Sequence, residues 1–321
     1  MAEDVAAAHA ISNDADGPTR PAIVAGAFWA LLTVAVWAAW PSVTRLSVTQ
    51  TLTPQDLVAL RYAVGGLVLL PLLMRQAPRI RRGGWREGFV LALFQGAPVA
   101  LLVTVGVQYA PASHMVSLSP GPLALFAAVL GFLFFYERVS ATRKVGLVMI
   151  FAGSLLMAGV SLATFTDGTW KGDLLFIAAG FMGSIYAVRM RRSGLTAMQG
   201  AAFIGVYSMA IYLPLYVALW LGSGRLTTAP PAEVGFQAAY QGLLMGALAL
   251  FSFSRAIMLL GAARAAAFVS LVPVVGTVLG VVILNEVPSV SEICAVVAIS
   301  VGVLLAAGAL QNSGRGPGVS G

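Results

Sequence analysis

The chain has 321 residues, of which 59% are hydrophobic and only 10% are charged, against roughly 25% charged in an ordinary soluble domain. This composition excludes a soluble protein, and the recurrence of long apolar runs predicts a polytopic membrane protein. The net charge of +7 does not indicate nucleic-acid binding, because the basic residues lie in short connectors between apolar runs. The single cysteine, Cys294, excludes a disulfide or a cysteine-based metal site within one chain.

The acidic residues 1–20 hold too few apolar side chains to order themselves, so we expect a disordered tail there. Ten apolar runs follow, each near the roughly 20 residues that a bilayer core requires. The predicted helices cover, in chain order, residues 22–44, 54–74, 88–109, 113–136, 142–162, 172–188, 197–220, 234–260, 263–284 and 290–310. They predict an all-α integral membrane protein with a linker over 163–171 and a second tail over 311–321.

Two of these helices carry recognisable start signals. Pro54 follows Thr53 at the beginning of the second helix, where a missing N–H is tolerated. Ser289 and Glu292 have the spacing of a capping box, which predicts the start of the tenth helix.

The sequence is duplicated, and the repeat relates the first five helices to the last five. Ser117–Pro120 in the fourth helix overlays Ser270–Pro273 in the ninth, and Gly153–Gly159 overlays Gly302–Gly308. Two further matched pairs share one offset: Leu52-Thr53 with Leu195-Thr196, and Leu70–Leu72 with Leu213–Leu215. We therefore predict a first five-helix repeat over 21–162 and a second over 172–310.

An odd number of helices in each repeat places the second copy upside down in the membrane, which gives an inverted repeat. Arginine and lysine test the orientation, because cytoplasmic connectors carry an excess of them. With the amino terminus inside, Arg45, Lys171 and Arg225 are the basic residues on the non-cytoplasmic side, and nearly all others lie on the cytoplasmic side. We expect a multi-pass protein of the bacterial inner cell membrane with both termini in the cytoplasm.

Three features together carry a resemblance to a known family: two halves of five helices, glutamates Glu137 and Glu286 at the ends of helices four and nine, and glycine-rich fifth and tenth helices. The sequence resembles the drug/metabolite transporter superfamily, specifically its EamA-domain exporters, over about residues 22–310. The resemblance implies two inverted five-helix repeats around a central cavity, lined by helices one, three and four with six, eight and nine. It also implies alternating access, with substrates such as amino acids, nucleotide sugars, sugar phosphates and small amphiphiles.

A substrate cavity needs polar and aromatic groups that face water rather than lipid. On the first helix, Trp29, Thr33, Trp37 and Trp40 have the spacing of one helical face, and we predict substrate contacts for Trp37 and Trp40. The alternative for Trp29 and Trp40 is a place in the aromatic belt at the membrane interface.

A second polar stripe runs along the eighth helix through Gln241, Met245, Leu248, Ser252 and Arg255. We predict substrate contacts for Gln241, Ser252 and Arg255, because a guanidinium suits a carboxylate or phosphate. The alternative for Arg255 is that its long side chain reaches the lipid headgroups.

Four polar residues inside apolar runs are further candidates for substrate binding: Gln95, Ser117, Ser270 and Thr277. The alternative for Ser and Thr is a hydrogen bond to a carbonyl of their own helix. Arg61 has Asp56 about a turn away, which indicates a snorkelling or structural charge rather than a ligand. The position of His114 before the fourth helix indicates a solvated side chain.

Pro120 and Pro273 are equivalent in the repeat, and each predicts a helix kink, because proline removes a helix hydrogen bond. Glu137 and Glu286 are candidates for coupling or gating, or else helix-end groups tied to arginines or backbone N–H groups. No carboxylate lies in the middle of a span, where proton relays are usually built. We therefore expect exchange or facilitated diffusion, unless one of these two glutamates carries a proton.

Transport is the function that these patterns favour, with export of an amino acid or a similar carboxylate-bearing amphiphile as the specific prediction. The alternatives are an integral-membrane enzyme and a non-transporting receptor or scaffold. We expect no catalytic residue, no metal ion and no cofactor, because no nucleophile lies near a base and no ligand cluster occurs. The expected partners are a small substrate and the lipid bilayer. A small-residue face, Ala298, Gly302 and Ala306, packs on the fifth helix or on a second protomer, so we expect a monomer or a weak homodimer.

Overall fold

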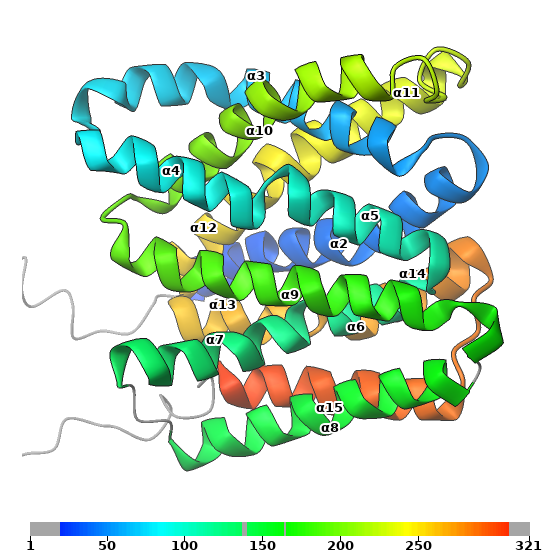
Figure 1. The fold of residues 1–321 in the computed structure, drawn as a ribbon. Helices are drawn as coiled ribbons and strands as arrows, with labels where there is room; N and C mark the ends of the chain where they lie inside the picture. Colours follow the sequence, from blue (N-terminus) through cyan, green and yellow to red (C-terminus); the bar gives the residue numbers. More distant parts are fainter. Residues whose placement is uncertain (1–19, 137–139, 164, 308–321) are drawn as a thin grey trace, which may run out of the picture.

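The computed structural model describes residues 20–136, 140–163 and 165–307, and every regular element in these ranges is a helix (Figure 1). Nine helical stretches of these residues are long and apolar enough to cross a bilayer, and a tenth, α15, is apolar but has only 17 residues. The all-α membrane fold predicted from the sequence is therefore confirmed.

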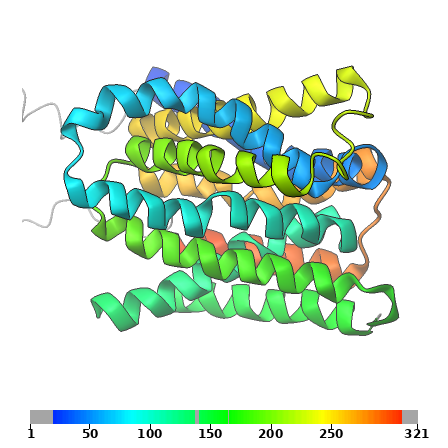
Figure 2. The ribbon, with the colours of Figure 1, turned by 45° about the horizontal axis from the view of Figure 1, so that its top comes forward.

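The ten spans run side by side across one bundle (Figures 1 and 2), and we number them one to ten in chain order. They are α2 (Arg20–Gln50); α3 (Pro54–Gln76); α4 (Arg82–Gln95) with α5 (Ala97–Tyr109); α6 (Ala112–Leu118) with α7 (Pro120–Phe135); α8 (Ala141–Ala163); α9 (Thr169–Arg192); α10 (Ala197–Leu219); α11 (Pro231–Gln237), η3 (Ala238–Leu248) and α12 (Ala249–Leu260); α13 (Ala262–Val269) with α14 (Val272–Leu284); and α15 (Val290–Ala306). Short 3₁₀ turns, η1 (Ala77–Arg79) and η2 (Phe165–Asp167), lie in two connectors.

The first span is longer than its predicted range of 22–44. It continues to Gln50 and carries Pro41 inside the helix, so Arg45 lies within α2 rather than in a connector. The helix continues because residues after Thr44 find partners elsewhere in the bundle: Arg45 pairs with Glu286, and Ser47 donates a hydrogen bond to Glu233. The sixth span also extends past its predicted range, from Thr169 to Arg192. The tails and Glu137 lie outside the described residues.

Four spans are irregular midway, and the irregularities fall in matched pairs. Span three is interrupted between Gln95 and Ala97, and its counterpart, span eight, contains the π-helical segment η3. Span four is interrupted between Leu118 and Pro120, and its counterpart, span nine, between Val269 and Val272. Irregular backbone at membrane depth is tolerated where it is buried in protein or lines a water-filled cavity.

The most extensive helix contacts follow a two-fold symmetry that exchanges span n with span n + 5. Span three packs on span six as span eight packs on span one, and span four packs on span six as span nine packs on span one. Span two contacts span eight just as span seven contacts span three. The pairs two–seven, five–ten and four–nine map onto themselves. Because each half has five spans, this symmetry relates two halves of opposite orientation.

Helix starts repeat in the same way. Thr53 and Thr196, equivalent in the repeat, both cap helices, and each forms a complete capping box with the residue three positions on. Ser289 forms the predicted box with Glu292 at the start of α15. These boxes satisfy N–H groups that have no partner within the helix.

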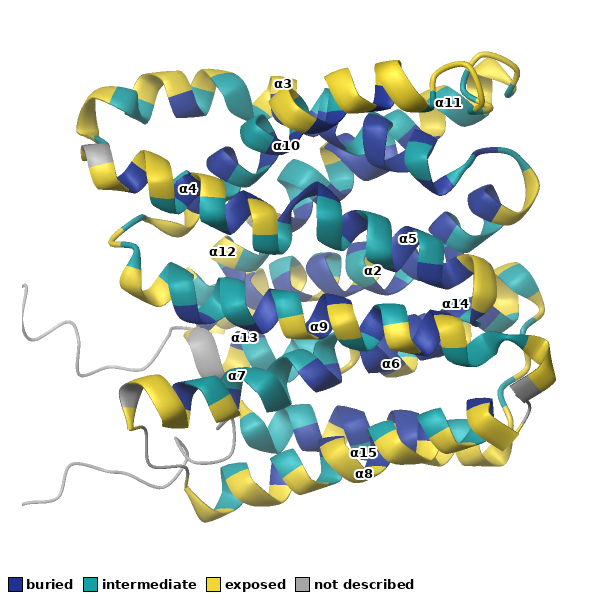
Figure 3. Cartoon of the chain, in the orientation of Figure 1, coloured by how far each residue is buried: buried dark blue, intermediate teal, exposed yellow. Residues whose placement is uncertain are grey.

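The tenth span packs on the fifth through glycine. A Cβ atom on Gly146 would collide with the backbone of Gly302 and Ala306, and one on Gly302 would collide with the backbone of Gly146. The small-residue face of span ten is therefore used within the chain. The outward faces of α3, α8 and α10 are exposed (Figure 3) and carry large apolar side chains such as Leu67, Phe151 and Leu215, as lipid contact requires.

Candidate functional site

A hydrogen-bonded pair joins span one to span eight deep inside the bundle. The indole N–H of Trp40 donates to Oε1 of Gln241 at 2.8 Å, and Nε2 of Gln241 donates to the hydroxyl of Thr44 at 3.1 Å. Gln241 is 1% exposed, and it lies within the π-helical segment η3. Trp40 precedes the end of α2 by ten residues, or about 15 Å of helix. Two predicted site residues, Trp40 and Gln241, are thus in direct contact.

The network continues from Gln241 toward the end of α2. Nε2 of Gln241 also lies 3.4 Å from Oε1 of Gln237, and Nε2 of Gln237 donates to Glu233 at 3.1 Å. Glu233 in turn accepts a hydrogen bond from the hydroxyl of Ser47 at 2.8 Å. These contacts form a polar seam between α2 and the first half of span eight, which holds the two spans in register.

Arg61 lies over the Trp40 ring of this seam. Its Cζ atom lies 5.0 Å from the centroid of the Trp40 ring and 6.0 Å from that of Tyr62. Its Nη1 atom is buried and has no hydrogen-bond partner among the described residues. A guanidinium over a Trp face is a cation–π contact.

The acidic residue nearest to Arg61 in the sequence is engaged elsewhere. Asp56 is fully buried, and its carboxylate accepts hydrogen bonds from the backbone N–H of Thr53 at 2.8 Å, the Tyr216 hydroxyl at 2.5 Å and the backbone N–H of Arg225 at 2.9 Å. Asp56 is therefore engaged at the helix start rather than with Arg61, although the two residues lie close in the sequence. The capping box at Thr53 turns the carboxylate toward the helix start.

Unpartnered polar atoms also lie beside the helix interruptions. Oε1 of Gln95 and the hydroxyls of Ser117 and Ser119 are buried, and none has a hydrogen-bond partner in the described part of the chain. Gln95 ends α4, and Gly183 of span six approaches its Oε1 atom closely enough that an added Cβ would lie 3.3 Å away. Buried polar atoms without partners are rare in native proteins, so their position beside the breaks marks this region as a candidate site.

The hydroxyls of three other candidates are satisfied by their own helices. Ser252 donates to the carbonyl of Leu248 at 2.7 Å, Ser270 to that of Ala267 at 2.7 Å and Thr277 to that of Pro273 at 2.8 Å. Pro120 and Pro273 lie at the starts of α7 and α14, directly after the two interruptions.

Trp37 packs with Trp40 against one hydrophobic cluster, which includes Tyr240 and Met245, but no hydrogen bond links Trp37 or Arg255 to Gln241 among the described residues. Trp37 packs on Phe253, with ring centroids 5.3 Å apart. Arg255 is partly exposed and forms no hydrogen bond or ion pair with a described residue. The π-helical segment changes the number of residues per turn between Gln241 and Arg255, so the two do not share the straight stripe expected for a regular α-helix.

Glu286 joins three spans at one end of the bundle, which we call the Glu286 end. One carboxylate oxygen pairs with Arg45, and the other accepts a hydrogen bond from the backbone N–H of Ala112 at 2.9 Å. Arg45 also donates to the carbonyl oxygens of Val107 and Ala110, which end span three. The interpretation of Glu286 as a helix-end group tied to an arginine and a backbone N–H fits this geometry.

A histidine cluster at the Glu286 end was missed by the sequence reasoning. His114 is 1% exposed, not solvated as expected, and its Nδ1 lies 2.8 Å from Asp173 while its Nε2 lies 2.7 Å from Glu292. The hydroxyl of Ser161 donates to Asp173 at 2.5 Å. Four spans therefore meet at one imidazole. Each carboxylate lies near a helix start in the sequence, and nothing in the sequence pairs them with His114.

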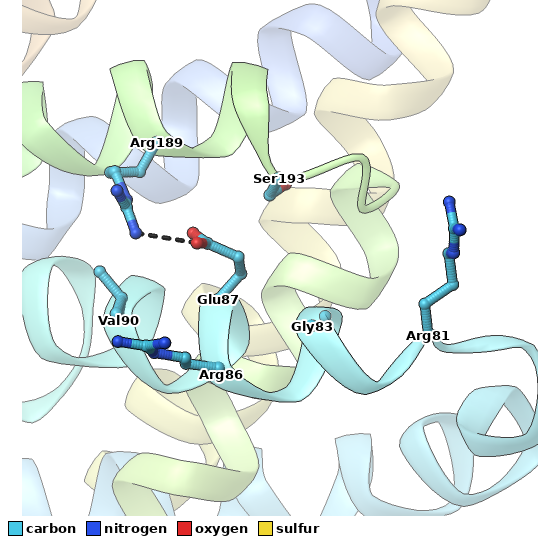
Figure 4. Close-up of a pocket in the computed structure, with 8 residues that line it drawn as sticks. Arg81, Gly83, Arg86, Glu87, Val90, Arg189 and Ser193 are labelled. Atoms are coloured by element: carbon cyan, nitrogen blue, oxygen red, sulfur yellow. Dashed lines mark hydrogen bonds and ion pairs between the residues drawn. The ribbon is translucent and has the colours of Figure 1, made fainter.

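The opposite end, which we call the arginine-rich end, is hollowed. A pocket of about 740 Å³ lies there between the starts of α4 and the last turn of α9, and it is lined by Arg81, Arg86, Glu87, Arg189 and Ser193 among others (Figure 4). Arg189 donates to Glu87 at 2.8 Å, but these side chains are 43% and 30% exposed, so the pair contributes little to stability. One end of the bundle is thus tied by buried polar contacts, while the other holds an open, basic pocket.

Comparisons with known proteins agree with this architecture. The sequence profile described as the EamA-like transporter family matches residues 24–159 and again 170–308. A protein of Brucella anthropi named riboflavin transporter is 27% identical over 202 residues, which cover 62% of this chain and 69% of that protein. A solved crystal structure is similar in fold, with a TM-score of 0.59 and 21% identity over 88% of this chain and 96% of that chain.

Proposed function

The chain belongs to the EamA-like transporter family and is a multi-pass membrane transporter, and from this premise we propose that it exports a small, carboxylate-bearing amphiphile such as an amino acid. The substrate contacts we propose are centred on Trp40 and Gln241. Gln95, Ser117 and the remaining candidates, Trp37, Ser252, Arg255, Ser270 and Thr277, complete the proposed lining in one or another state of the transport cycle.

The observation that carries this proposal is the Trp40–Gln241 pair beside spans with irregular backbone. Discontinuous helices at the interface of two inverted repeats form the substrate sites of many secondary transporters. An indole and an amide supply an apolar surface and fixed polar groups, which is the usual composition of a small-molecule site. The unpartnered oxygens of Gln95 and Ser117 support the same location, because a bound ligand would give them partners.

The asymmetry between the two ends supports alternating access. We infer that the arginine-rich end faces the cytoplasm of a bacterial cell, because Arg and Lys accumulate in cytoplasmic connectors, and both termini then lie inside. The conformation described here would be closed on the outside by Arg45–Glu286 and open toward the cytoplasm. Glu286, and by the repeat Glu137, would act in gating, with transport by exchange or facilitated diffusion. We expect a monomer or a weak homodimer.

A second candidate substrate is a flavin or another planar heteroaromatic compound. The relative named riboflavin transporter favours it, and the aromatic rings of Trp37, Trp40 and Phe253 would suit a flat ligand. This candidate predicts recognition by stacking, whereas an amino acid requires recognition of its charged groups.

Reconstituted vesicles test both candidates. Uptake of radiolabelled amino acids and of radiolabelled riboflavin would be measured for the wild type and for Trp40→Ala and Gln241→Ala. Trp29→Ala is the matched control, because Trp29 lies on the same helix and packs on Phe28 and Phe251. We expect the two site variants to lose most transport and the control to keep it. If no compound is transported, or if all three variants behave alike, the proposed function or site is wrong.

A further inference from the structure

We propose that Arg61 is the anion-binding residue of this transporter, a role that rests on the proposed function and names the charged group it recognises. The class of ligand is an oxyanion, a carboxylate or a phosphate, on a small molecule with an apolar part. Arg61 is the eighth residue of α3, so it lies about 10 Å inside the helix start at Pro54.

The first reason is that the charge of Arg61 is not neutralised within the described residues. None of the ion pairs between described residues includes Arg61, and Asp56 is held by Thr53, Tyr216 and Arg225. An arginine keeps its proton under all ordinary conditions, and a charged group inside a membrane is costly unless it is paired. We therefore expect an unpaired arginine at this depth to bind a ligand through its charge.

The second reason is the way in which the guanidinium is held. The Trp40 ring covers one face of Arg61 at 5.0 Å, and the Trp40 indole N–H is fixed in turn by Gln241. The Nη1 atom of this guanidinium is buried and has no hydrogen-bond partner among the described residues. The planar fork of an arginine edge matches the two oxygens of a carboxylate or phosphate.

Three other arginines of the spans do not meet these conditions. Arg45 is paired with Glu286, and Arg189 with Glu87. Arg255 lies five residues before the end of α12 at Leu260, where its side chain can reach lipid headgroups. Snorkelling accounts poorly for Arg61, because its Nη1 atom is buried and its guanidinium lies against Trp40 of span one.

Two measurements on purified protein test the proposal. In lipid-free detergent, the unfolding temperature would be recorded with phenylacetate, with its uncharged amide phenylacetamide, and without ligand. We expect phenylacetate to stabilise the wild type and the Arg75→Gln control, which changes an exposed arginine in the last turn of the same helix, and phenylacetamide to do so much less. Arg61→Gln would bind phenylacetate ~10- to 100-fold more weakly, the change that follows from loss of a charged hydrogen bond.

The ligand-free stability separates this role from a structural one. Removal of an unpaired charge should leave the unfolding temperature of Arg61→Leu equal to or above that of the wild type, whereas loss of a structural arginine should lower it. A lower temperature for Arg61→Leu would overturn the proposal. If Arg61→Gln does not fold, Arg61→Lys decides: unchanged discrimination between phenylacetate and its amide would overturn the proposal, and reduced discrimination would support it.

Two further arms keep the outcomes distinct. Adding phosphatidylglycerol to the detergent tests a lipid phosphate as the anion: if it alone stabilises the wild type through Arg61, the site binds lipid and the substrate inference is overturned. If phenylacetate binds through Arg61 but the vesicles transport no compound, the proposed function fails and the anion site stands. If the vesicles transport and Arg61→Gln matches the wild type in binding, the anion site fails and the proposed function stands.

Discussion

Arg45 and Glu286 join span one to span nine across 241 positions of sequence, and Arg45 also holds the last carbonyl oxygens of span three. Both side chains are partly exposed, at 19% and 22%. The pair is therefore screened by solvent, and its contribution is modest enough to be broken and re-formed during a transport cycle.

Glu286→Gln should open the Glu286 end. Loss of about 1 kcal/mol from the closed state corresponds to about a fivefold change in an equilibrium constant. We expect about fivefold faster maleimide labelling of Ala110→Cys, a buried position at this end, in a Cys294→Ser background. Glu87→Gln, which removes the pair at the arginine-rich end, is the control. Equal labelling in both variants would show that Arg45–Glu286 does not close this end.

His114→Ala should destabilise the fold strongly. The substitution leaves Asp173 and Glu292 without the imidazole between them, and loss of one partner from a buried charged cluster costs about 3–5 kcal/mol. Thermal unfolding in detergent measures the effect, and adding Asp173→Asn should recover part of it. Ser113→Ala, at the neighbouring position, is the control, and an equal unfolding temperature for the two single variants would contradict the cluster's role.

Gly146→Ala and Gly159→Ala should have opposite effects although both lie on α8. A methyl group at Gly146 would collide with the backbone of Gly302 and Ala306, and overpacking of this kind costs about 1–3 kcal/mol. Gly159 has open space around it, so alanine there should stabilise the helix by about 0.5–1 kcal/mol. Unfolding temperatures of the two variants on either side of the wild type would confirm this prediction, and shifts in the same direction would refute it.

Ser208→Ala should destabilise the protein at the break in span three, between α4 and α5. The Ser208 hydroxyl accepts a hydrogen bond from the backbone N–H of Ala97 at 3.1 Å, where the helix restarts after Gly96. A buried N–H without a partner costs about 1–3 kcal/mol. Ser42→Ala removes a buried hydroxyl that has no partner in the described chain, so it should have little effect. The unfolding temperature and the transport activity in vesicles would be measured for both variants. Equal losses of stability and transport in Ser208→Ala and Ser42→Ala would show that Ser208 does not support the break.

The spans and their repeat could be predicted from the sequence because both depend on local composition. About twenty consecutive apolar residues define a span wherever they occur. The equivalence of Thr53 and Thr196 can be read from the aligned sequences of the two repeats, and both residues form capping boxes in the structure. Trp40 and Gln241 could each be predicted as a site candidate, because an indole and an amide stand out within apolar runs. Their contact with each other could not be predicted, since it depends on how span eight packs on span one.

The electrostatic details could not be predicted because sequence proximity misled. Asp56 is near Arg61 in the chain, but its carboxylate is used by the helix start and by Tyr216. His114 seemed isolated, but folding brings carboxylates from positions 59 and 178 residues away to its two nitrogens. The π-helical segment η3 leaves no signal that we could identify in the sequence, and it changes which residues of span eight share a face.

The pairs two–seven and five–ten are the most extensively packed of the contacts that the two-fold symmetry maps onto themselves. A rocking of one half against the other that exchanges the roles of the two ends would swap contacts such as three–six and one–eight for one another, yet leave these two pairs in place. They would serve as pivots, and their close glycine packing would be preserved throughout the motion. The difference in free energy between the two end states would then depend on residues that break the symmetry, so a few substitutions at either end would suffice to reset which side the resting protein faces.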